Sequence, residues 1–138
     1  TFRMVLYFFP MTGRPDRPLP DNWNNIEEAK GCTIQNCLFR DNYDKIISLN
    51  AVPIGISTQK VDDNREMTRR LALPYDVLSD EKFELRNSLN LPIFLINKKK
   101  YLKRVSLIIE RNIIKKVFYP IYSLDKHIEE VLKWLQEN

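Results

Sequence analysis

Short apolar runs rich in β-branched and aromatic residues alternate with helical patterns along the 138-residue chain, and this alternation most restricts its fold. Residues 3–9 (RMVLYFF) and 51–57 (AVPIGIS) are such runs and predict buried strands. Residues 103–110 and 113–119 predict two more strands around a tight turn at Arg111-Asn112. Strands interleaved with helices predict an α/β fold, in which a central sheet carries helices on both faces.

Four segments show helical signals. The first spans residues 32–50, and an amphipathic helix over residues 62–72 ends before Pro74. Ser79 is predicted to be the N-cap of a third helix, because its hydroxyl suits that position. The fourth helix, over residues 123–136, places its apolar residues on one face: Ile128, Val131, Leu132 and Leu135.

Prolines set limits on two segments. Pro53 has no backbone N–H for a ladder, so the strand over residues 51–57 is predicted to be an edge strand or to begin after the proline. Residues 10–31 contain Pro10, Pro15, Pro18 and Pro20 and predict a long ordered loop. Loops of this length within compact domains are uncommon and often functional.

The length of the chain fits one compact domain, and no repeat or linker divides it, so we expect residues 1–138 to form a single domain. The net charge of +4 is mild, and the only basic cluster, Lys98-Lys99-Lys100, is expected in a solvated turn. The sequence shows no nucleic-acid motif, no secretory signal pattern and no apolar run near the roughly 20 residues that span a membrane. We therefore expect a cytoplasmic protein without a nucleic-acid or membrane partner.

The chain contains two cysteines, Cys32 and Cys37, and one histidine, His127. A tetrahedral metal site needs about four ligands, so this set predicts no metal site. A secreted disulfide scaffold usually carries four or more cysteines. Buried thiols, a lone structural bridge and redox chemistry remain as interpretations of the pair. His127 lies in the closing helix, where we expect it on the surface.

Cys32 lies where the long loop becomes a helix. The unpaired N–H groups and the dipole of a helix start favour an anion there, so the thiol is expected to ionise more easily, and the thiolate is the nucleophile. Gly31 lets the backbone approach closely. Five helical residues separate the Cα atoms of Cys32 and Cys37 by roughly 8–9 Å, whereas a disulfide needs roughly 4.4–6.8 Å. This spacing argues against a static bridge and suits a bond that forms transiently as the helix unwinds.

Residues 31–41, GCTIQNCLFRD, resemble the active-site helix of peroxiredoxins (AhpC/TSA superfamily) of the bacterioferritin-comigratory-protein type. The TGRP sequence at residues 12–15 resembles a subgroup with a long loop before the active-site cysteine. The resemblance covers nearly the whole chain in order. Its other parts are Tyr7-Phe8-Phe9-Pro10, Ile54-Gly55-Ile56-Ser57, Leu78-Ser79-Asp80, Arg104-Val105-Ser106-Leu107-Ile108 and Val117-Phe118-Tyr119-Pro120.

The resemblance implies a thioredoxin-like fold with a central mixed sheet. It implies that Cys32 attacks the peroxide O–O bond, that Cys37 resolves the resulting sulfenic acid as a disulfide, and that Arg104 stabilises the thiolate. Hydrogen peroxide or organic hydroperoxides would be the substrates, and a thioredoxin-like or other thiol the reductant. No cofactor is implied, and we expect a monomer or weak homodimer.

Two departures from the family pattern affect these expectations. The family places a Thr three residues before the peroxidatic cysteine, where this chain has Ala29, so Thr12 or Thr33 is predicted to supply the hydroxyl. We expect Gly31, Thr33 and Thr12 to be the substrate-binding residues. Relatives usually carry an N-terminal hairpin before the first strand found here, and a domain lacking it would leave part of its sheet uncovered.

Two alternatives to a peroxidase follow from the same residues. A redox sensor or interaction protein with this fold would use the oxidation of Cys32 as a signal and show little peroxidase turnover. A disulfide reductase of the thioredoxin class is disfavoured, because such proteins need Cys-x-x-Cys, whereas four residues separate Cys32 and Cys37.

Overall fold

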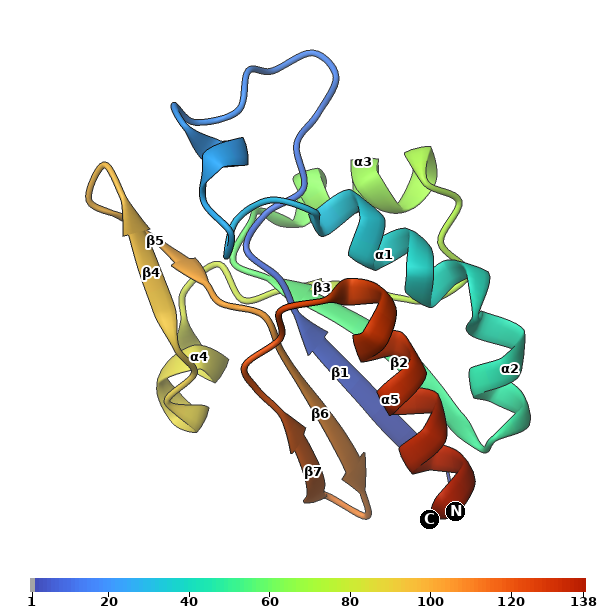
Figure 1. Cartoon of the computed structure of the whole chain (residues 1–138). Coiled ribbons are helices and arrows are strands. Elements are labelled where there is room, and N and C mark those ends of the chain that lie inside the picture. Colours follow the sequence, from blue (N-terminus) through green and yellow to red (C-terminus); the bar gives the residue numbers. More distant parts are fainter. Residues whose placement is uncertain (1) are drawn as a thin grey trace.

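The computed structural model, which describes residues 2–138, contains a five-stranded mixed sheet in the order β3-β2-β1-β6-β7 (Figure 1). Strand β1 lies at the centre, parallel to β2 and antiparallel to β6, while β2–β3 is parallel and β6–β7 antiparallel. The first strand of the chain therefore joins the parallel half of the sheet to its antiparallel half. The strands are β1 (Arg3–Phe8), β2 (Ala51–Ser57), β3 (Val77–Ser79), β6 (Val105–Glu110) and β7 (Ile113–Phe118).

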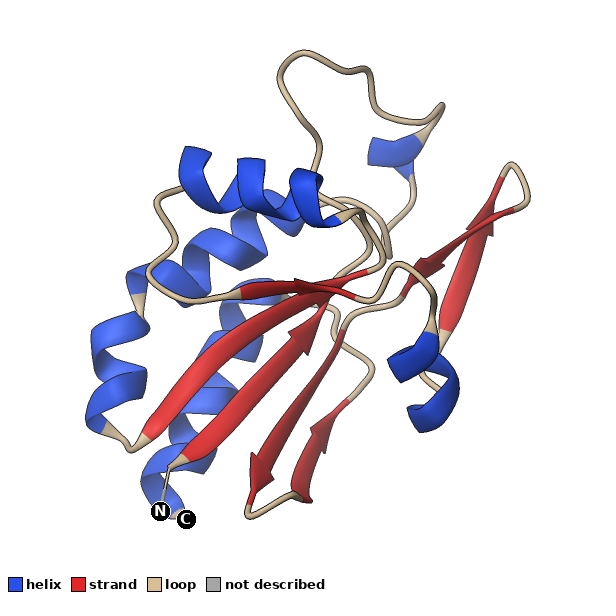
Figure 2. Cartoon of the chain, turned by 180° about the vertical axis from the view of Figure 1, so that it is seen from behind, coloured by secondary structure: helices blue, strands red, loops and turns tan. Residues whose placement is uncertain are grey.

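Helices lie on both faces of this sheet, as the sequence predicts. Helices α1, α2 and α5 cover one face, with α3 beside the β3 edge, while α4 and a separate β4–β5 hairpin lie toward the other face (Figures 1 and 2). The predicted mixed α/β fold is confirmed. These elements are α1 (Cys32–Asp41), α2 (Tyr43–Ser48), α3 (Val61–Arg70), α4 (Glu84–Leu89), α5 (Leu124–Glu137), β4 (Ile93–Ile96) and β5 (Lys99–Leu102).

Strand β1 contributes to two separate hydrophobic clusters because its side chains alternate between the two faces. Val5 and Tyr7 are fully buried in the cluster under α1 and α5, and Phe8 is fully buried in the cluster on the other face. This burial on both faces explains why RMVLYFF is almost continuously apolar. The second face is covered less completely, since Ile114 and Val117 of β7 remain exposed. That the domain lacks the N-terminal hairpin of its relatives stays a prediction.

The segment predicted as one helix over residues 32–50 is two helices, which is a correction. α1 ends at Asp41 and α2 begins at Tyr43, with Asn42 between them outside the helical region of φ and ψ. The side-chain Nδ2 of Asn42 donates to the carbonyl of Leu38 at 2.8 Å. Asn side chains that bond nearby backbone groups compete with helical hydrogen bonding, and this bond accompanies the break.

The prediction of Ser79 as an N-cap is also wrong. Ser79 is the last residue of β3, and α4 begins only at Glu84. The carboxylate of Asp80 accepts from the backbone N–H groups of Leu85 and Arg86, at 3.0 and 2.9 Å. Asp80, and not Ser79, therefore satisfies free N–H groups at the start of α4.

Three strands were not expected: β3 and the two strands of the β4–β5 hairpin. Asn97 and Lys98 form the hairpin tip with φ of 49° and 66°, whereas Lys99 and Lys100 already belong to β5. The lysine triplet thus lies only in part in a turn. Pro53 lies inside β2, which is an interior strand, so the edge prediction is wrong. The N–H of Gly55 points toward the β3 side, and residues two apart in a strand point the same way. An N–H at Pro53 would therefore point to the same side, but the pairing of β2 with β3 begins only at Gly55, so no ladder bond is lost.

The long loop over residues 10–31 is confirmed, with one short 3-10 helix, η1 (Trp23–Asn25). Trp23 is buried and contacts the ring of Tyr101 in β5, with centroids 5.1 Å apart. Ala29 and Ile96 complete this cluster, so the loop is fixed against the hairpin. Across residues 2–138, no helix combines the length and apolar character needed to cross a membrane.

Candidate active site

Cys32 is the first residue of α1 and is only 3% exposed. Gly31 before it has a φ of 93°, in the left-handed region that favours glycine. A Cβ at Gly31 would lie 3.0 Å from Leu124 Cδ1 of α5, so a larger residue would also have to displace the Leu124 side chain. The chain can therefore turn sharply from the loop into the helix and still leave the thiol at the helix start.

Arg104, just before β6, is buried and contacts the thiol directly. Its Nη2 lies 3.1 Å from Cys32 Sγ, and its Nε donates to Gln35 Oε1 at 3.0 Å. The predicted proximity of Arg104 to Cys32 is confirmed, although the role of Arg104 stays a prediction. In the loop before Cys32, the carbonyl oxygen of Glu28 accepts from Nη1 of Arg104. The carbonyl oxygens of Ala29 and Lys30 accept from the same Nη2 that faces the thiol.

Two opposing effects act on the Cys32 thiol. Burial raises its pKa above the ordinary value, while the charge of Arg104, a backbone hydrogen bond from Met11 and the hydrogen bond from Arg104 lower it. Burial is the largest effect, so the net pKa is raised. The expectation that the Cys32 thiol ionises more easily is therefore wrong in this structure, whereas the expected direction of the Arg104 effect is confirmed.

Thr12 folds back from the long loop toward α1 and is buried. Its backbone is held by Gln59, whose Oε1 accepts from the Thr12 N–H at 3.1 Å and whose Nε2 donates to the Thr12 carbonyl at 3.2 Å. Thr33 is exposed on the first turn of α1. A cavity of about 380 Å³ is lined by Cys32, Thr12 and Thr33 together. Both candidate hydroxyls therefore lie at the site, and Thr12 is the one held in place.

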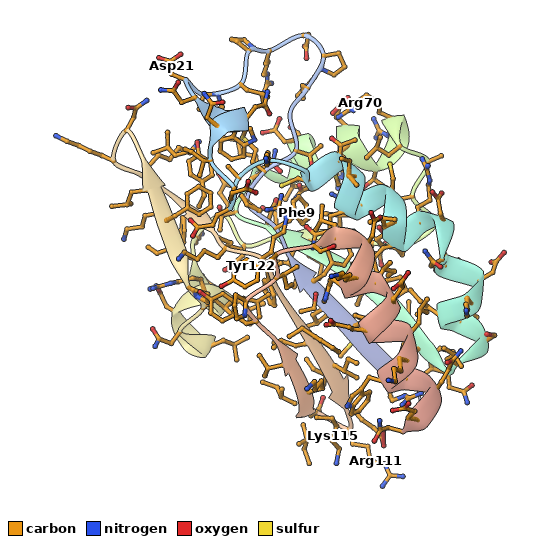
Figure 3. The ribbon with its side chains drawn as sticks, in the orientation of Figure 1. Phe9, Asp21, Arg70, Arg111, Lys115 and Tyr122 are labelled. Atoms are coloured by element: carbon orange, nitrogen blue, oxygen red, sulfur yellow. The ribbon has the colours of Figure 1, made fainter. Side chains whose placement is uncertain are left out.

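Cationic side chains line the same cavity: Arg14, Arg17 and Arg70. Arg70 extends from α3 to donate to the carbonyl of Gly13 at 2.9 Å, and Figure 3 shows it beside the long loop. Each of these arginines also forms a salt bridge: Arg14 and Arg17 with Asp63, and Arg70 with Glu66. Arg14 pairs with Asp16 as well. Their charges are thus largely balanced within the chain.

Cys37 lies in the middle of α1, in the same continuous helix as Cys32, and both cysteines are free thiols. It is half-buried, and it lies close enough to Tyr75 that a thiolate there would raise the pKa of the tyrosine. The structure thus keeps the two thiols in the reduced, helical arrangement that the sequence predicts.

Two buried polar residues on the same helix, Gln35 and Asn36, are not among the site residues that the sequence predicts. They follow Cys32 by three and four residues and share its helix face, which was the available signal. Gln35 orients Arg104, while its Nε2 has no hydrogen-bond partner within residues 2–138. Asn36 joins α1 to Tyr7 of β1 and to the long loop.

His127 is buried, which corrects the prediction of a surface residue. Its Nε2 is 2.8 Å from Ser106 Oγ on β6, and its ring packs against Phe118 and Phe39. Burial lowers the pKa of His127 to about 4. The residue is therefore a neutral core histidine with a hydroxyl partner. Among the described residues, no group of three or more His, Cys, Asp or Glu side chains is arranged to hold a metal ion.

The mixed sheet, the helix-start thiol and the buried arginine beside it define a thioredoxin-like protein with a cysteine-based site. The sequence pattern of the AhpC/TSA family matches residues 23–117, and the chain belongs to this family. Within the family it is similar to peroxiredoxin Q and bacterioferritin comigratory protein.

Chloroplastic peroxiredoxin Q of Suaeda salsa is 31% identical over 134 residues, which are 96% of this chain and 55% of that protein. The Arabidopsis thaliana protein of the same name is 30% identical over 133 residues, 96% of this chain and 54% of its own. This chain thus spans about half the length of these relatives. Peroxidoxin BcpB of Mycobacterium tuberculosis has a similar structure, with a TM-score of 0.76 at 22% identity over 98% of this chain and 79% of that chain.

Proposed function

We propose that this chain is a thiol-dependent peroxidase that reduces hydrogen peroxide or organic hydroperoxides through Cys32. The contact of 3.1 Å between Arg104 Nη2 and Cys32 Sγ carries this proposal. A guanidinium at this distance stabilises the thiolate, which is the form that attacks a peroxide. A peroxide would reach the thiol through the adjoining cavity, whose lining includes Cys32.

In the first step, the Cys32 thiolate attacks the nearer peroxide oxygen and the O–O bond breaks. Cys32 becomes a sulfenic acid, and the departing alkoxide or hydroxide takes up a proton to leave as an alcohol or water. The N–H groups of Arg104 that face the thiol and the loop would stabilise the negative charge as it moves from the sulfur to the departing oxygen. Gly31, Thr12 and Thr33 would bind the substrate beside the thiol.

In the second step, the Cys37 thiol attacks the sulfenic sulfur of Cys32, forming a disulfide and releasing water. An external dithiol, such as a thioredoxin-like protein, then restores both thiols by exchange and is itself oxidised. The two electrons that reduce the peroxide thus come from this reductant. No cofactor is needed for this cycle.

The relatives support the choice of peroxide substrates. Bacterioferritin comigratory protein from Xanthomonas campestris, whose structure was solved as a trapped intermediate/ligand complex, has alkyl peroxide reduction activity. Its structure has a TM-score of 0.76 to this chain at 15% identity, covering 99% of this chain and 79% of that one. The preferred peroxide, the reductant, the cytoplasmic location and the monomer or weak dimer remain predictions.

The decisive test is peroxide consumption with thioredoxin, thioredoxin reductase and NADPH, for the wild type and Cys32→Ser. We expect steady turnover by the wild type and none by the variant, because serine lacks the nucleophilic sulfur. Ser48→Cys, which adds an exposed thiol at the end of α2, is a matched control and should not change turnover. Wild-type turnover in Cys32→Ser would exclude the assignment.

A redox sensor is the second candidate, and the burial that raises the pKa of Cys32 favours it. A thiol that ionises with difficulty reacts slowly, which suits a signal more than a rapid catalyst. The same assay separates the two candidates. Many peroxide molecules consumed per chain indicate an enzyme, whereas one slow oxidation per chain indicates a sensor.

A further inference from the structure

Asn36 lies on α1 between the two cysteines and is fully buried. Its Nδ2 donates to the Cys32 carbonyl at 2.9 Å and to Thr12 Oγ1 at 3.3 Å. Its Oδ1 accepts from the hydroxyl of Tyr7 on β1. The Cys32 carbonyl can only accept, which fixes the orientation of the amide. The contacts to Cys32 and Thr12 then use both N–H groups, and the contact to Tyr7 uses the amide oxygen.

Tyr75, in the segment between α3 and β3, completes this cluster. Its hydroxyl donates to the backbone carbonyl of Asn36 at 3.0 Å and is 2.6 Å from the Tyr7 hydroxyl. Both tyrosine rings are buried, and the ring of Tyr7 stacks on Phe39 of α1 with centroids 4.1 Å apart. One helix residue is therefore bonded to the central strand, to the long loop and to the segment before β3.

Helical geometry makes this cluster an obstacle to disulfide formation. Five helical residues hold the Cα atoms of Cys32 and Cys37 roughly 8–9 Å apart, while a disulfide needs roughly 4.4–6.8 Å. The turn between them must therefore unwind, and Asn36 is part of that turn. Unwinding separates Asn36 from Tyr7, Tyr75 and Thr12, and buried polar groups that lose their partners oppose such a change.

We infer that Asn36 is a positioning residue that keeps α1 wound in its peroxide-reactive form, and that the Tyr7–Asn36–Tyr75 cluster limits how fast Cys37 reaches the oxidised Cys32. This inference rests on the proposed peroxidase cycle. It assigns a role to three residues that do not carry the reacting sulfur. Looser bonding in this cluster favours the unwound form and hence faster disulfide formation.

The cluster consequently sets the outcome of a competition. The sulfenic acid of Cys32 either reacts with the Cys37 thiol, giving a disulfide and water, or with a second peroxide, giving a sulfinic acid and an alcohol or water. The first reaction needs an unwound helix, whereas the second needs only the wound, peroxide-reactive site. A tighter cluster therefore makes the protein more sensitive to inactivation by excess peroxide.

The experiment compares the wild type with Tyr75→Phe, which removes one hydroxyl and keeps the ring. Samples are mixed with hydrogen peroxide, quenched at intervals by a thiol-alkylating reagent, and analysed by mass spectrometry for thiol, disulfide and sulfinic acid. Loss of the buried hydrogen bond to the Asn36 carbonyl, together with the contact to the Tyr7 hydroxyl, should speed Cys32–Cys37 disulfide formation about three- to tenfold. The peroxide dose that converts half of Cys32 to sulfinic acid should rise by the same factor.

Tyr43→Phe is the matched control, because Tyr43 stacks on Tyr75 but forms none of the hydrogen bonds of the cluster. It should form the disulfide at the wild-type rate. Asn36→Ala should speed disulfide formation more than Tyr75→Phe does, since it breaks the contacts to Tyr7 and Thr12 together. The loss of Cys32 thiol in the same samples separates faster unwinding from general misfolding, which would slow that loss.

Two negative results have different meanings. If the wild type forms no Cys32–Cys37 disulfide, the proposed cycle fails. If the wild type forms it and Tyr75→Phe and Asn36→Ala form it at the wild-type rate, the cycle stands and the role of the cluster is overturned.

Discussion

The two cysteines of α1 lie on one helix but have different surroundings. Cys32 is almost completely buried at the helix start, with Arg104 Nη2 at 3.1 Å and the carbonyl of Ala29 at 3.5 Å from its sulfur. Cys37 is half-buried in the middle of the helix, and its side chain forms no hydrogen bond to another residue in the described part of the chain. The surrounding residues thus hold the Cys32 thiol in place, whereas the Cys37 thiol is less constrained and more exposed.

The cations near the two thiols show the same difference. Arg104 directs an N–H group at Cys32, whereas Arg40 donates to Asp41 and to the carbonyl of Leu71. The hydrogen bond to Asp41 is the largest effect that raises the pKa of Arg40, and the nearby Cys37 is the next. The charge of Arg40 is thus shared with a carboxylate. Backbone N–H groups at a helix start are free, but those at mid-helix are used. The contrast indicates that reactivity is placed at Cys32 and that Cys37 contributes when the helix moves.

Cys37→Ser should have the largest effect, because it removes one of the two thiols compared above. The variant should react once with peroxide and then stop, because serine cannot resolve the sulfenic acid. Steady-state turnover with thioredoxin should fall to the detection limit, and excess peroxide should drive Cys32 to the sulfinic acid. The wild type treated in the same way should show faster amide exchange between Cys32 and Phe39.

Peptide mapping of the oxidised wild type checks that result. A Cys32–Cys37 peptide is expected as the main product. An intermolecular Cys32–Cys32 linkage in its place would contradict the intramolecular scheme and favour a one-cysteine enzyme or a sensor.

Arg104→Ala removes the cation that contacts Cys32, which most distinguishes its surroundings from those of Cys37. Because the charge of Arg104 lowers the pKa of Cys32, its loss should raise that pKa further. The rate of peroxide reaction at neutral pH should then fall about tenfold, as measured by thiol titration and single-turnover kinetics. Lys103→Ala, which removes the adjacent cation paired with Glu28, is the control and should leave the titration unchanged.

Arg104→Lys sharpens the same test. It keeps the charge but loses the fork that binds the loop carbonyls. A titration curve unaltered in both Arg104 variants would remove Arg104 from the site.

His127→Gln should have the smallest effect on the chemistry. It should act through packing, because the ring of His127 contacts Phe39, which lies two residues after Cys37 in α1. Burial lowers the pKa of His127 to about 4, below its ordinary value of 6.5. As the pH falls through this interval, the unfolded chain binds a proton that the folded chain does not, so the free energy of unfolding decreases. This stabilisation is present above pH 6.5 and is lost toward pH 4.

Urea unfolding at pH 7.5 and pH 5 measures this effect. The wild type should lose about 2 kcal/mol more than His127→Gln between these values. Peroxide reactivity at neutral pH should be the same in both proteins. Equal losses of stability on acidification would show that His127 does not stay neutral in the folded chain.

Local chemistry explains which parts of the fold could be predicted. The central strand, the closing helix and the helix start at Cys32 follow from apolar periodicity and from Gly31, and these predictions are confirmed. The β4–β5 hairpin was missed because its tip contains Asn97 and Lys98 rather than glycine. A lysine with positive φ is not a turn signal, so the run LPIFLINKKK did not indicate two strands.

The candidate site also has parts that the sequence predicts and parts that it does not. The proximity of Arg104 and Cys32 could be expected from the resemblance, because both residues belong to recognisable segments. The cluster around Asn36 depends on Tyr7 and Tyr75, which come from distant segments and meet only in the folded chain. His127 was misplaced for the same reason, since Ser106, which accepts or donates the hydrogen bond that permits burial, lies on another element.

The central position of β1 has a consequence for how the protein is made. Cys32 precedes Arg104 by 72 residues, and β1 must pair with β6 before the two meet. At ribosomal rates of about 5–20 residues per second, the thiol emerges roughly 4 to 14 seconds before its cation. During that interval, the nascent chain carries Cys32 as an ordinary thiol, so peroxide reactivity that depends on Arg104 begins only when synthesis has passed the second half of the sheet.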